Sequence, residues 1–184
     1  MQVEAFPIEG PKLIRLKRIE DARGFFSEIY NKSLFRELIG DVDFVQDNFS
    51  LSKIKGVIRG LHFQSPPFAQ GKLVRVTRGA IFDVAVDIRR SAPTFGEFIS
   101  VVLSADNSSQ LWVPPGFAHG FCALEPNSEV AYKVTEFYNR DHDLGLAWDD
   151  PALGIPWPVA VEDAFLSERD RLHPVLSALP AYFF

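Results

Sequence analysis

The 184-residue chain contains one cysteine, one methionine and no long apolar run. A single cysteine cannot form an intrachain disulfide, so we expect Cys122, which lies in the apolar segment 120–124, to be a small buried hydrophobe. No stretch approaches the ~20 apolar residues that a membrane-spanning helix needs, and the N-terminus lacks the basic region and apolar core of a signal peptide. The sequence therefore predicts a protein of the reducing cytoplasm with no membrane partner.

The chain also lacks the patterns that hold large anions, nucleotide cofactors or metals. Its net charge is −5 with no dense basic stripe, so a nucleic-acid partner is not expected. No G-x-G-x-x-G opens a helix, so no bound nicotinamide is expected. Metal sites in small barrels usually need a pattern such as His-x-His, whereas His62 is followed by Phe63 and Gln64. We therefore expect neither a catalytic metal nor a bound nicotinamide.

What is present is a hydrophobic content of 47%, including 17 Phe, without repeats or linkers. One domain over residues 1–184 follows. Only two short helices are expected, one over residues 33–39 and one opening at Ser167, where Asp170 has capping-box spacing. Many short strands with few helices indicate an all-β sandwich, barrel or jelly roll. The expected strands are 12–19, 57–64, 72–77, 81–88, 98–103, 111–113, 120–124 and 130–135.

Alternation within these strands assigns faces to their side chains. In strand 81–88 the large apolar residues share one face while Asp83 and Asp87 share the other, which predicts a half-buried strand. Tyr132 lies on the same face as Val130 and Val134, and Lys72 lies on the apolar face of its own strand. Tyr132 alone is consistent with a core tyrosine, and Lys72 alone with a snorkelling side chain. Together they indicate a polar site inside the barrel.

His62 is a candidate base because an imidazole titrates near neutral pH. Alternation puts Arg59 and His62 on opposite faces of a regular strand, which opposes a shared site unless Gly60 marks a bulge or a bend. Asp170 has two interpretations. It completes a capping box with Ser167, or the fold brings it to His62 and fixes the tautomer of the imidazole.

Several ordered motifs, from about residue 3 to 175, carry a resemblance to a known family. They are Arg23-Gly-Phe-Phe26, Phe44-Val-Gln-Asp-Asn48, Arg59-Gly-Leu-His62, Gln70-Gly-Lys-Leu-Val-Arg75, Phe82-Asp-Val-Ala-Val-Asp-Ile-Arg89, Pro93-Thr-Phe-Gly96, Gln110-Leu-Trp-Val-Pro-Pro-Gly-Phe-Ala-His-Gly-Phe121 and Leu166-Ser-Glu-Arg-Asp170. Each motif alone is weak. As a set they resemble the dTDP-4-dehydrorhamnose 3,5-epimerase family.

The resemblance implies a cupin jelly roll, a homodimer that exchanges N-terminal strands, and catalysis without metal or cofactor. It implies that His62 is the base paired with Asp170, that Tyr132 is the acid on the opposite face of the sugar, and that Lys72 stabilises the enolate oxygen. The implied substrate contacts are Arg59 and His119 at the pyrophosphate, Gln46, Asn48 and Glu28 near the subunit boundary, Arg23 and Phe26 from the partner subunit, Tyr138 on thymine, and Asp143 and Arg169.

The chain departs from the family pattern at three positions. Phe49 stands where His is frequent, Asp143 where Glu is frequent and Arg169 where Lys is frequent, so contacts there differ in geometry. The implied substrate is a dTDP-4-keto-6-deoxyhexose in dTDP-rhamnose biosynthesis. Two alternatives stay open: a single-centre epimerase of a related sugar, and a non-catalytic nucleotide-sugar binding module.

Overall fold

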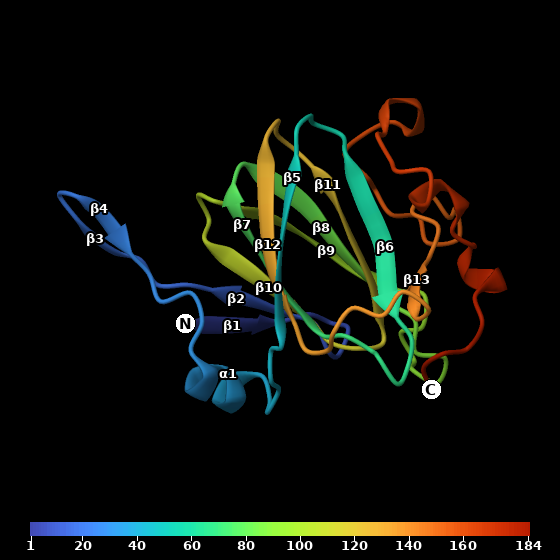
Figure 1. The fold of residues 1–184 in the computed structure, drawn as a ribbon, viewed down its shortest axis with the longest axis horizontal. Helices are drawn as coiled ribbons and strands as arrows, with labels where there is room; N and C mark the ends of the chain where they lie inside the picture. The colour runs from blue at the N-terminus through green and yellow to red at the C-terminus, as the bar shows by residue number, and fades with distance from the viewer.

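The computed structural model describes all residues from 1 to 184 and consists mainly of two antiparallel sheets packed face to face (Figure 1). The first sheet has the order β1 (Gln2–Ala5), β2 (Lys12–Arg15), β10 (Ser109–Val113), β7 (Lys72–Arg78), β12 (Ser128–Val134) and β5 (Gln46–Ser52). The second has the order β13 (Asp143–Gly145), β6 (Ile58–Gln64), β11 (Phe117–Ala123), β8 (Ala80–Asp87) and β9 (Phe98–Ser104). This arrangement is the predicted all-β jelly-roll architecture.

The main core lies between the two sheets. Val74 and Val130 of the first sheet pack with Ile81, Ala85 and Phe121 of the second. Because these side chains alternate with outward-facing ones along each strand, every inward-pointing polar residue must lie in this layer or in a cavity within it. The fold thus directs Tyr132 and Lys72 towards the second sheet.

Both outer faces are partly covered. Helix α1 (Lys32–Leu38) begins after the N-cap Asn31 and packs Phe35 against Trp112 on the first sheet. The C-terminal segment, with the 3-10 turns η1 (Val161–Asp163), η2 (Asp170–Leu172) and η3 (Leu176–Ala178), covers the second sheet. Cys122 is fully buried there, and burial raises the pKa of its thiol to about 11, which confirms it as a core residue. No helix is long and apolar enough to cross a membrane.

Strand β8 is buried on both faces, whereas the sequence predicted a half-buried strand over 81–88. Its apolar face, including Val84 and Val86, packs on the C-terminal segment, whereas the opposite face lines the space between the sheets. Asp83 and Asp87 on that inner face are therefore fully buried and not solvated. Asp87 is compensated by an ion pair of 2.6 Å with Arg89. The C-terminal segment buries the outer face of β8 and the first sheet covers its inner face, a double cover that strand alternation alone does not reveal.

Other boundaries also differ from the sequence prediction. The strand predicted over 12–19 ends at Arg15, and the chain then forms a separate hairpin of β3 (Ile19–Asp21) and β4 (Gly24–Phe26). The helix predicted from Ser167 is only the 3-10 turn η2, because Pro174 follows within four residues and disfavours helix just before it. Strands β1, β5 and β13 were not predicted.

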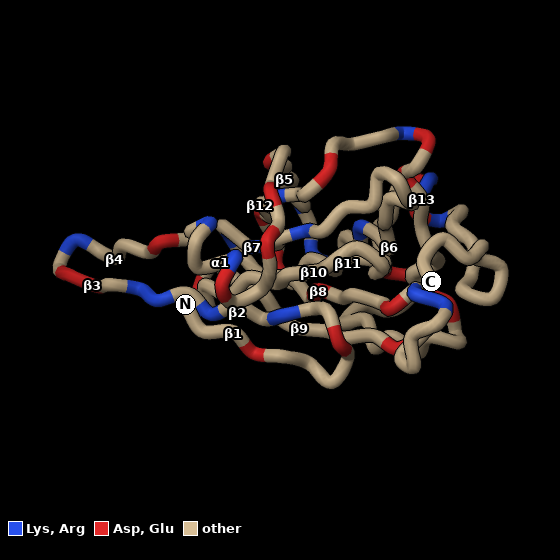
Figure 2. Tube along the Cα trace, turned by 90° about the horizontal axis from the view of Figure 1, so that it is seen from below, with Lys and Arg blue, Asp and Glu red and all other residues tan.

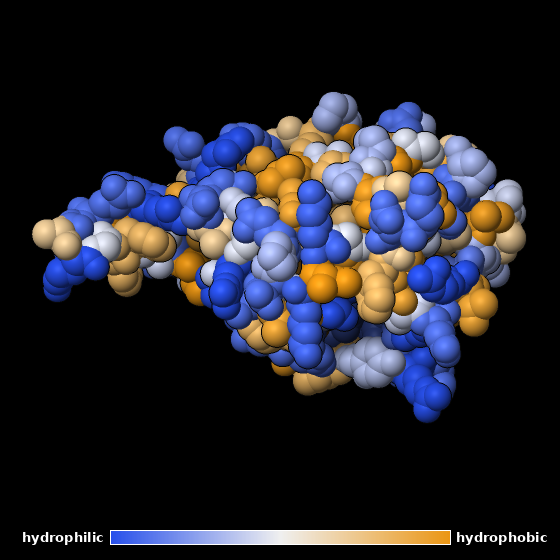
Figure 3. Space-filling view, turned by 90° about the horizontal axis from the view of Figure 1, so that it is seen from above, coloured by the Kyte–Doolittle hydropathy of each residue, from blue (hydrophilic) through white to orange (hydrophobic).

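Acidic and basic residues are interspersed along the chain, and the hairpin β3–β4 carries some of each (Figure 2). The space-filling view in Figure 3 shows the hairpin extending well away from the two sheets, with apolar and polar surface side by side.

Candidate active site

A cavity of about 790 Å³ opens between the two sheets. Its lining includes His62 from β6, Lys72 from β7, Tyr132 from β12, and Asp170 from η2. A second cavity of about 400 Å³ shares His62, Lys72 and Tyr132 with the first. The three residues predicted to transfer protons or to stabilise the enolate therefore lie where the two cavities meet. The combined space is of the size that a small-molecule ligand occupies.

A bulge in β6 places Arg59 and His62 together. In the register of β6 with β11, His62 pairs with His119 and Arg59 pairs with Phe121. The three residues from Arg59 to His62 on β6 therefore span only two residues on β11. Gly60 lies at this extra residue with a φ of +135°, and a Cβ on it would lie 2.5 Å from the Cα of Gly120. Only glycine fits here. The bulge reverses the alternation, so both side chains line the cavity as a shared site requires.

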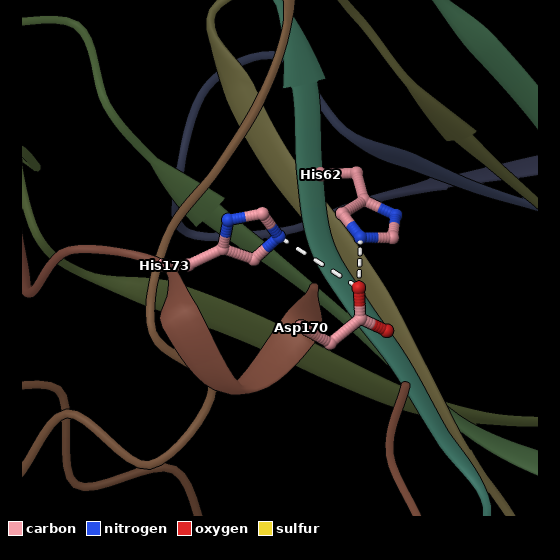
Figure 4. A group of neighbouring side chains, drawn as sticks. All are labelled: His62, Asp170 and His173. Carbon is pink, nitrogen blue, oxygen red and sulfur yellow. Dashed lines mark hydrogen bonds and ion pairs between the residues drawn. The ribbon is translucent and has the colours of Figure 1, made fainter. Parts of the chain in front are cut away.

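His62 and Asp170 form a hydrogen bond of 2.8 Å between Nε2 and Oδ1 (Figure 4). Burial acts to raise the pKa of Asp170, but its polar contacts with His173, His62 and Ser167 outweigh burial and hold that pKa well below the usual range. An ionised carboxylate only accepts, so Nε2 of His62 carries the proton and Nδ1 has the free lone pair. The second interpretation of Asp170 is thus correct, although its backbone N–H also donates to Ser167 Oγ at 3.1 Å.

The environment of His62 keeps the imidazole neutral. Burial lowers its pKa most strongly, the hydrogen bond and charge of Asp170 raise it, and the nearby Lys72 and His173 lower it further. The net pKa lies below the ordinary value of 6.5. At neutral pH the side chain is therefore an unprotonated, oriented base.

Lys72 and Tyr132 face this base from the first sheet. Lys72 donates to the backbone carbonyl of His62 at 3.1 Å, and burial lowers its pKa to about 8 despite the charges of Asp143 and Asp83. Burial raises the pKa of Tyr132, which keeps the phenol protonated. The cavity therefore presents a base on one wall and, on the opposite wall, a cation and a proton donor.

The predicted substrate contacts divide between the two cavities. Arg59, His119 and Arg169 line the larger one. His119 is held by Asp83 at 2.5 Å, a partner that the sequence prediction had placed on a solvated face. Arg59 donates to the carbonyl of Leu51 at 3.0 Å and to Ser52 Oγ at 3.4 Å, which leaves further guanidinium N–H groups for an anion.

The smaller cavity contains Gln46, Asn48, Tyr138 and Asp143. Gln46 donates to Asn48 at 2.8 Å, and Asp143 forms an ion pair of 2.6 Å with Arg169. The ring of Tyr138 is 56% exposed, so a planar ligand has access to it. The aspartate and arginine that depart from the family pattern thus contact each other, and each compensates the other's charge.

Three predicted contacts lie outside both cavities. Arg23 and Phe26 belong to the projecting hairpin, where Arg23 pairs with Asp21 at 2.6 Å and Phe26 is 68% exposed. Glu28 is also exposed and accepts from Asn31 at 3.3 Å. Within one chain these residues do not reach the site, so their roles stay predictions that depend on a partner subunit.

The donor atoms of His62, Asp170 and His173 lie within 4.8 Å of one another. The Nε2 proton of His62 points at the carboxylate, so a metal would have to displace the hydrogen bond that orients the base. The expected absence of a metal stays a prediction, and it is tested by metal analysis of the purified protein.

Sequence reasoning missed two residues of the site. Asp83 lies on the face opposite Val84 and Val86 as predicted, but its burial between the sheets and its contact with His119 were not predicted, and His173 was given no role. The spacing of three residues between Asp170 and His173 was a usable signal, because side chains at i and i+3 of a 3-10 turn lie on the same side.

The geometry matches what the comparisons with known proteins find. The family model described as dTDP-4-dehydrorhamnose 3,5-epimerase matches residues 5–178. A protein of that name from Sinorhizobium fredii is 52% identical over 183 residues, which is 100% of this chain and 93% of the relative.

Solved structures agree. The 3,5-epimerase of Legionella pneumophila, solved with dTDP-4-keto-L-rhamnose, superposes with a TM-score of 0.93 at 44% identity, covering 98% of this chain and 95% of the other. A 3'-monoepimerase from Streptomyces bikiniensis, solved with dTDP-quinovose, has a TM-score of 0.87 at 31% identity, covering 94% and 86%. The chain belongs to the dTDP-4-dehydrorhamnose 3,5-epimerase family.

Proposed function

We propose that the chain epimerises dTDP-4-dehydro-6-deoxy-D-glucose at C3 and C5 to dTDP-4-dehydro-L-rhamnose, a step of dTDP-L-rhamnose biosynthesis. The observation that carries the proposal is the opposition of His62 on the second sheet and Tyr132 on the first, with Lys72 beside them. A hydrogen next to a ketone is acidic because the charge left behind delocalises onto oxygen. Inversion therefore needs a base on one face of the sugar and an acid on the other.

Each inversion transfers two protons and leaves the net redox state unchanged. Nδ1 of His62 removes the proton from the carbon next to the C4 ketone, and the electron pair of the broken C–H bond forms the enolate. The ammonium of Lys72 stabilises the negative oxygen. Tyr132 then donates its phenolic proton to the opposite face of the same carbon, and solvent restores both groups. The same pair acts at C3 and at C5.

The remaining polar side chains suit the nucleotide. Arg59 and His119 in the larger cavity provide donors for the two phosphates, and the exposed ring of Tyr138 provides a stacking surface for thymine. No metal or organic cofactor has a place in this mechanism. A cytoplasmic location stays a prediction.

A homodimer completes the proposed site. The hairpin β3–β4 projects from its own chain, with Phe25 and Phe26 57% and 68% exposed. Such apolar exposure on a protruding element indicates a covering partner. We place Arg23 and Phe26 at the ligand of the other subunit and Glu28 near the subunit boundary, and the exchange of N-terminal strands belongs to the same proposal.

The test is proton NMR of dTDP-4-keto-6-deoxyglucose incubated with the purified protein in deuterium oxide. Deuterium at both C3 and C5, with the L-rhamno product formed, is expected. Deuterium at one carbon only would select a single-centre epimerase, the kind of enzyme represented by the similar 3'-monoepimerase. Binding of the substrate with no deuterium at either carbon would contradict catalysis and leave a nucleotide-sugar binding module.

A further inference from the structure

His173 lies directly behind the His62–Asp170 pair, outside the set of residues predicted to act. It follows the turn η2 that carries Asp170, and the residue is about nine-tenths buried. Its ring packs edge-on against the ring of His62, with centroids 5.4 Å apart and an interplanar angle of 84°. Figure 4 shows both imidazoles directed at the same carboxylate from different sides.

The two histidines converge on one oxygen atom. Nε2 of His62 lies 2.8 Å from Asp170 Oδ1, and Nε2 of His173 lies 3.7 Å from the same oxygen. That second nitrogen is buried and has no hydrogen-bond partner. A buried polar atom without a partner is costly, so a core position for it needs an explanation. The Asp170 carboxylate that this nitrogen faces provides one through charge attraction, because 3.7 Å is longer than a hydrogen bond.

Gly145 makes the room that His173 occupies. It pairs with His62 across β13 and β6, and a Cβ on it would lie 2.3 to 2.4 Å from three atoms of the His173 ring. The following backbone is fixed too, because Ala147 N–H donates to the carbonyl of Pro174 at 2.8 Å. The strand next to the base therefore lacks a side chain at the one point where the second imidazole is inserted.

We propose that His173 is a positioning residue for the epimerase base: it holds the Asp170 carboxylate in the orientation that accepts the Nε2 proton of His62. The inference rests on the proposed function, because it assumes that His62 is the base. A carboxylate fixed by His62 alone is free to rotate about its side-chain bonds. The imidazole of His173 on the other side of the same oxygen restricts that rotation by packing and by its attraction to the carboxylate, and so keeps Nδ1 of His62 aimed at the sugar.

The test uses three single variants of the full-length protein. His173→Leu fills the slot without a donor, His173→Gln retains an N–H donor at the end of the side chain, and Leu172→Ala is the matched control in the same turn, where the side chain is 82% exposed. We expect kcat to fall about ten-fold in His173→Leu with KM changed less than about two-fold, to recover most of the loss in His173→Gln, and to stay unchanged in Leu172→Ala.

A role in stability alone predicts a different pattern. Equal losses in the leucine and glutamine variants, or a rise in KM with kcat unchanged, would overturn the proposal, as would a normal kcat in His173→Leu. Wild-type protein is assayed in parallel for deuterium uptake. Its failure to exchange would overturn the proposed function itself, independently of how the variants rank.

A double-mutant cycle guards against a misfolded single variant. Gly145→Ala pushes a methyl group into the His173 ring, so we expect it to lower kcat in the wild-type background. In the His173→Ala background the ring is gone, and the same substitution is expected to have little further effect. Full additivity of the two losses would contradict an action through the histidine ring.

Discussion

At the scale of single residues, the account depends on a neutral His62 that Asp170 orients. Substituting His62 with Ala removes the base and leaves the rest of the cavity intact. We expect kcat to fall by roughly 10²–10⁴-fold, the usual contribution of one positioned acid–base group. The Kd for dTDP, measured by calorimetry, is expected to stay within about two-fold of wild type. A comparable loss of dTDP binding would mean that the histidine belongs to the nucleotide site instead.

In the proposed mechanism, the pH dependence of kcat/KM follows from two groups, the base His62 and the cation Lys72. His62 acts when neutral, and its pKa lies below the ordinary 6.5, so activity persists as pH falls to below that value and is lost only when the ring is protonated. Lys72 acts when charged, and its pKa is about 8, so activity falls as pH rises through about 8.

The variant Lys72→Arg separates the two limbs of this profile. A guanidinium stays charged throughout the accessible range, so we expect the alkaline limb to move upward while the acid limb stays in place. The matched comparison is the wild-type profile in the same buffers. An alkaline limb that remains near pH 8 in the arginine variant would show that another group controls it.

At the scale of elements, the bulge in β6 is what joins Arg59 to His62. Gly60→Ala puts a methyl group 2.5 Å from the Gly120 Cα at a φ of +135°, so we expect a loss of about 3 kcal/mol or more in the free energy of unfolding. Gly154→Ala is the matched control. It also has a positive φ, +61°, but open space around it, so a loss of about 1 kcal/mol is expected.

Urea unfolding at one fixed protein concentration measures both variants, since an oligomer's stability depends on concentration. Equal losses in the two variants would mean that the close approach of β6 to β11 contributes nothing beyond backbone strain.

The elements also show what the sequence alone can predict. Alternation correctly assigned the inward faces of Lys72 and Tyr132, because strands β7 and β12 are long and regular. It did not predict that both faces of β8, including the face with Asp83, are buried, because the cover on the outer face of β8 comes from residues far along the chain. It also left Arg59 and His62 unresolved, since a glycine permits a bulge but does not require one.

At the scale of the whole molecule, the strand pattern predicted an all-β sandwich, barrel or jelly roll. The contact of Asp170 with His62, in contrast, joins residues that are 108 positions apart. Local patterns do not encode such a contact. The resemblance to the family supplied it, along with the roles of Arg23, Phe26 and Glu28, which the single chain leaves outside the cavities.

The proposed dimer predicts complementation between two inactive proteins. In Arg23→Ala the hairpin is defective, and in His62→Ala the base is absent, so a hybrid dimer contains one site in which both residues are intact. After subunit exchange of an equal mixture we expect about a quarter of wild-type activity, since half the dimers are hybrids with one complete site each. The two variants assayed separately under the same exchange conditions are the controls. Activity no higher than their mean would contradict a site shared between subunits.

The central claim is that two groups act from opposite walls, His62 as base and Tyr132 as acid. The most direct test is NMR of the substrate incubated with Tyr132→Phe in deuterium oxide. We expect deuterium to enter at the carbon that His62 deprotonates while the configuration is retained, because the enolate can then be reprotonated only from the side of His62. Normal inversion in this variant would contradict the assignment of the acid.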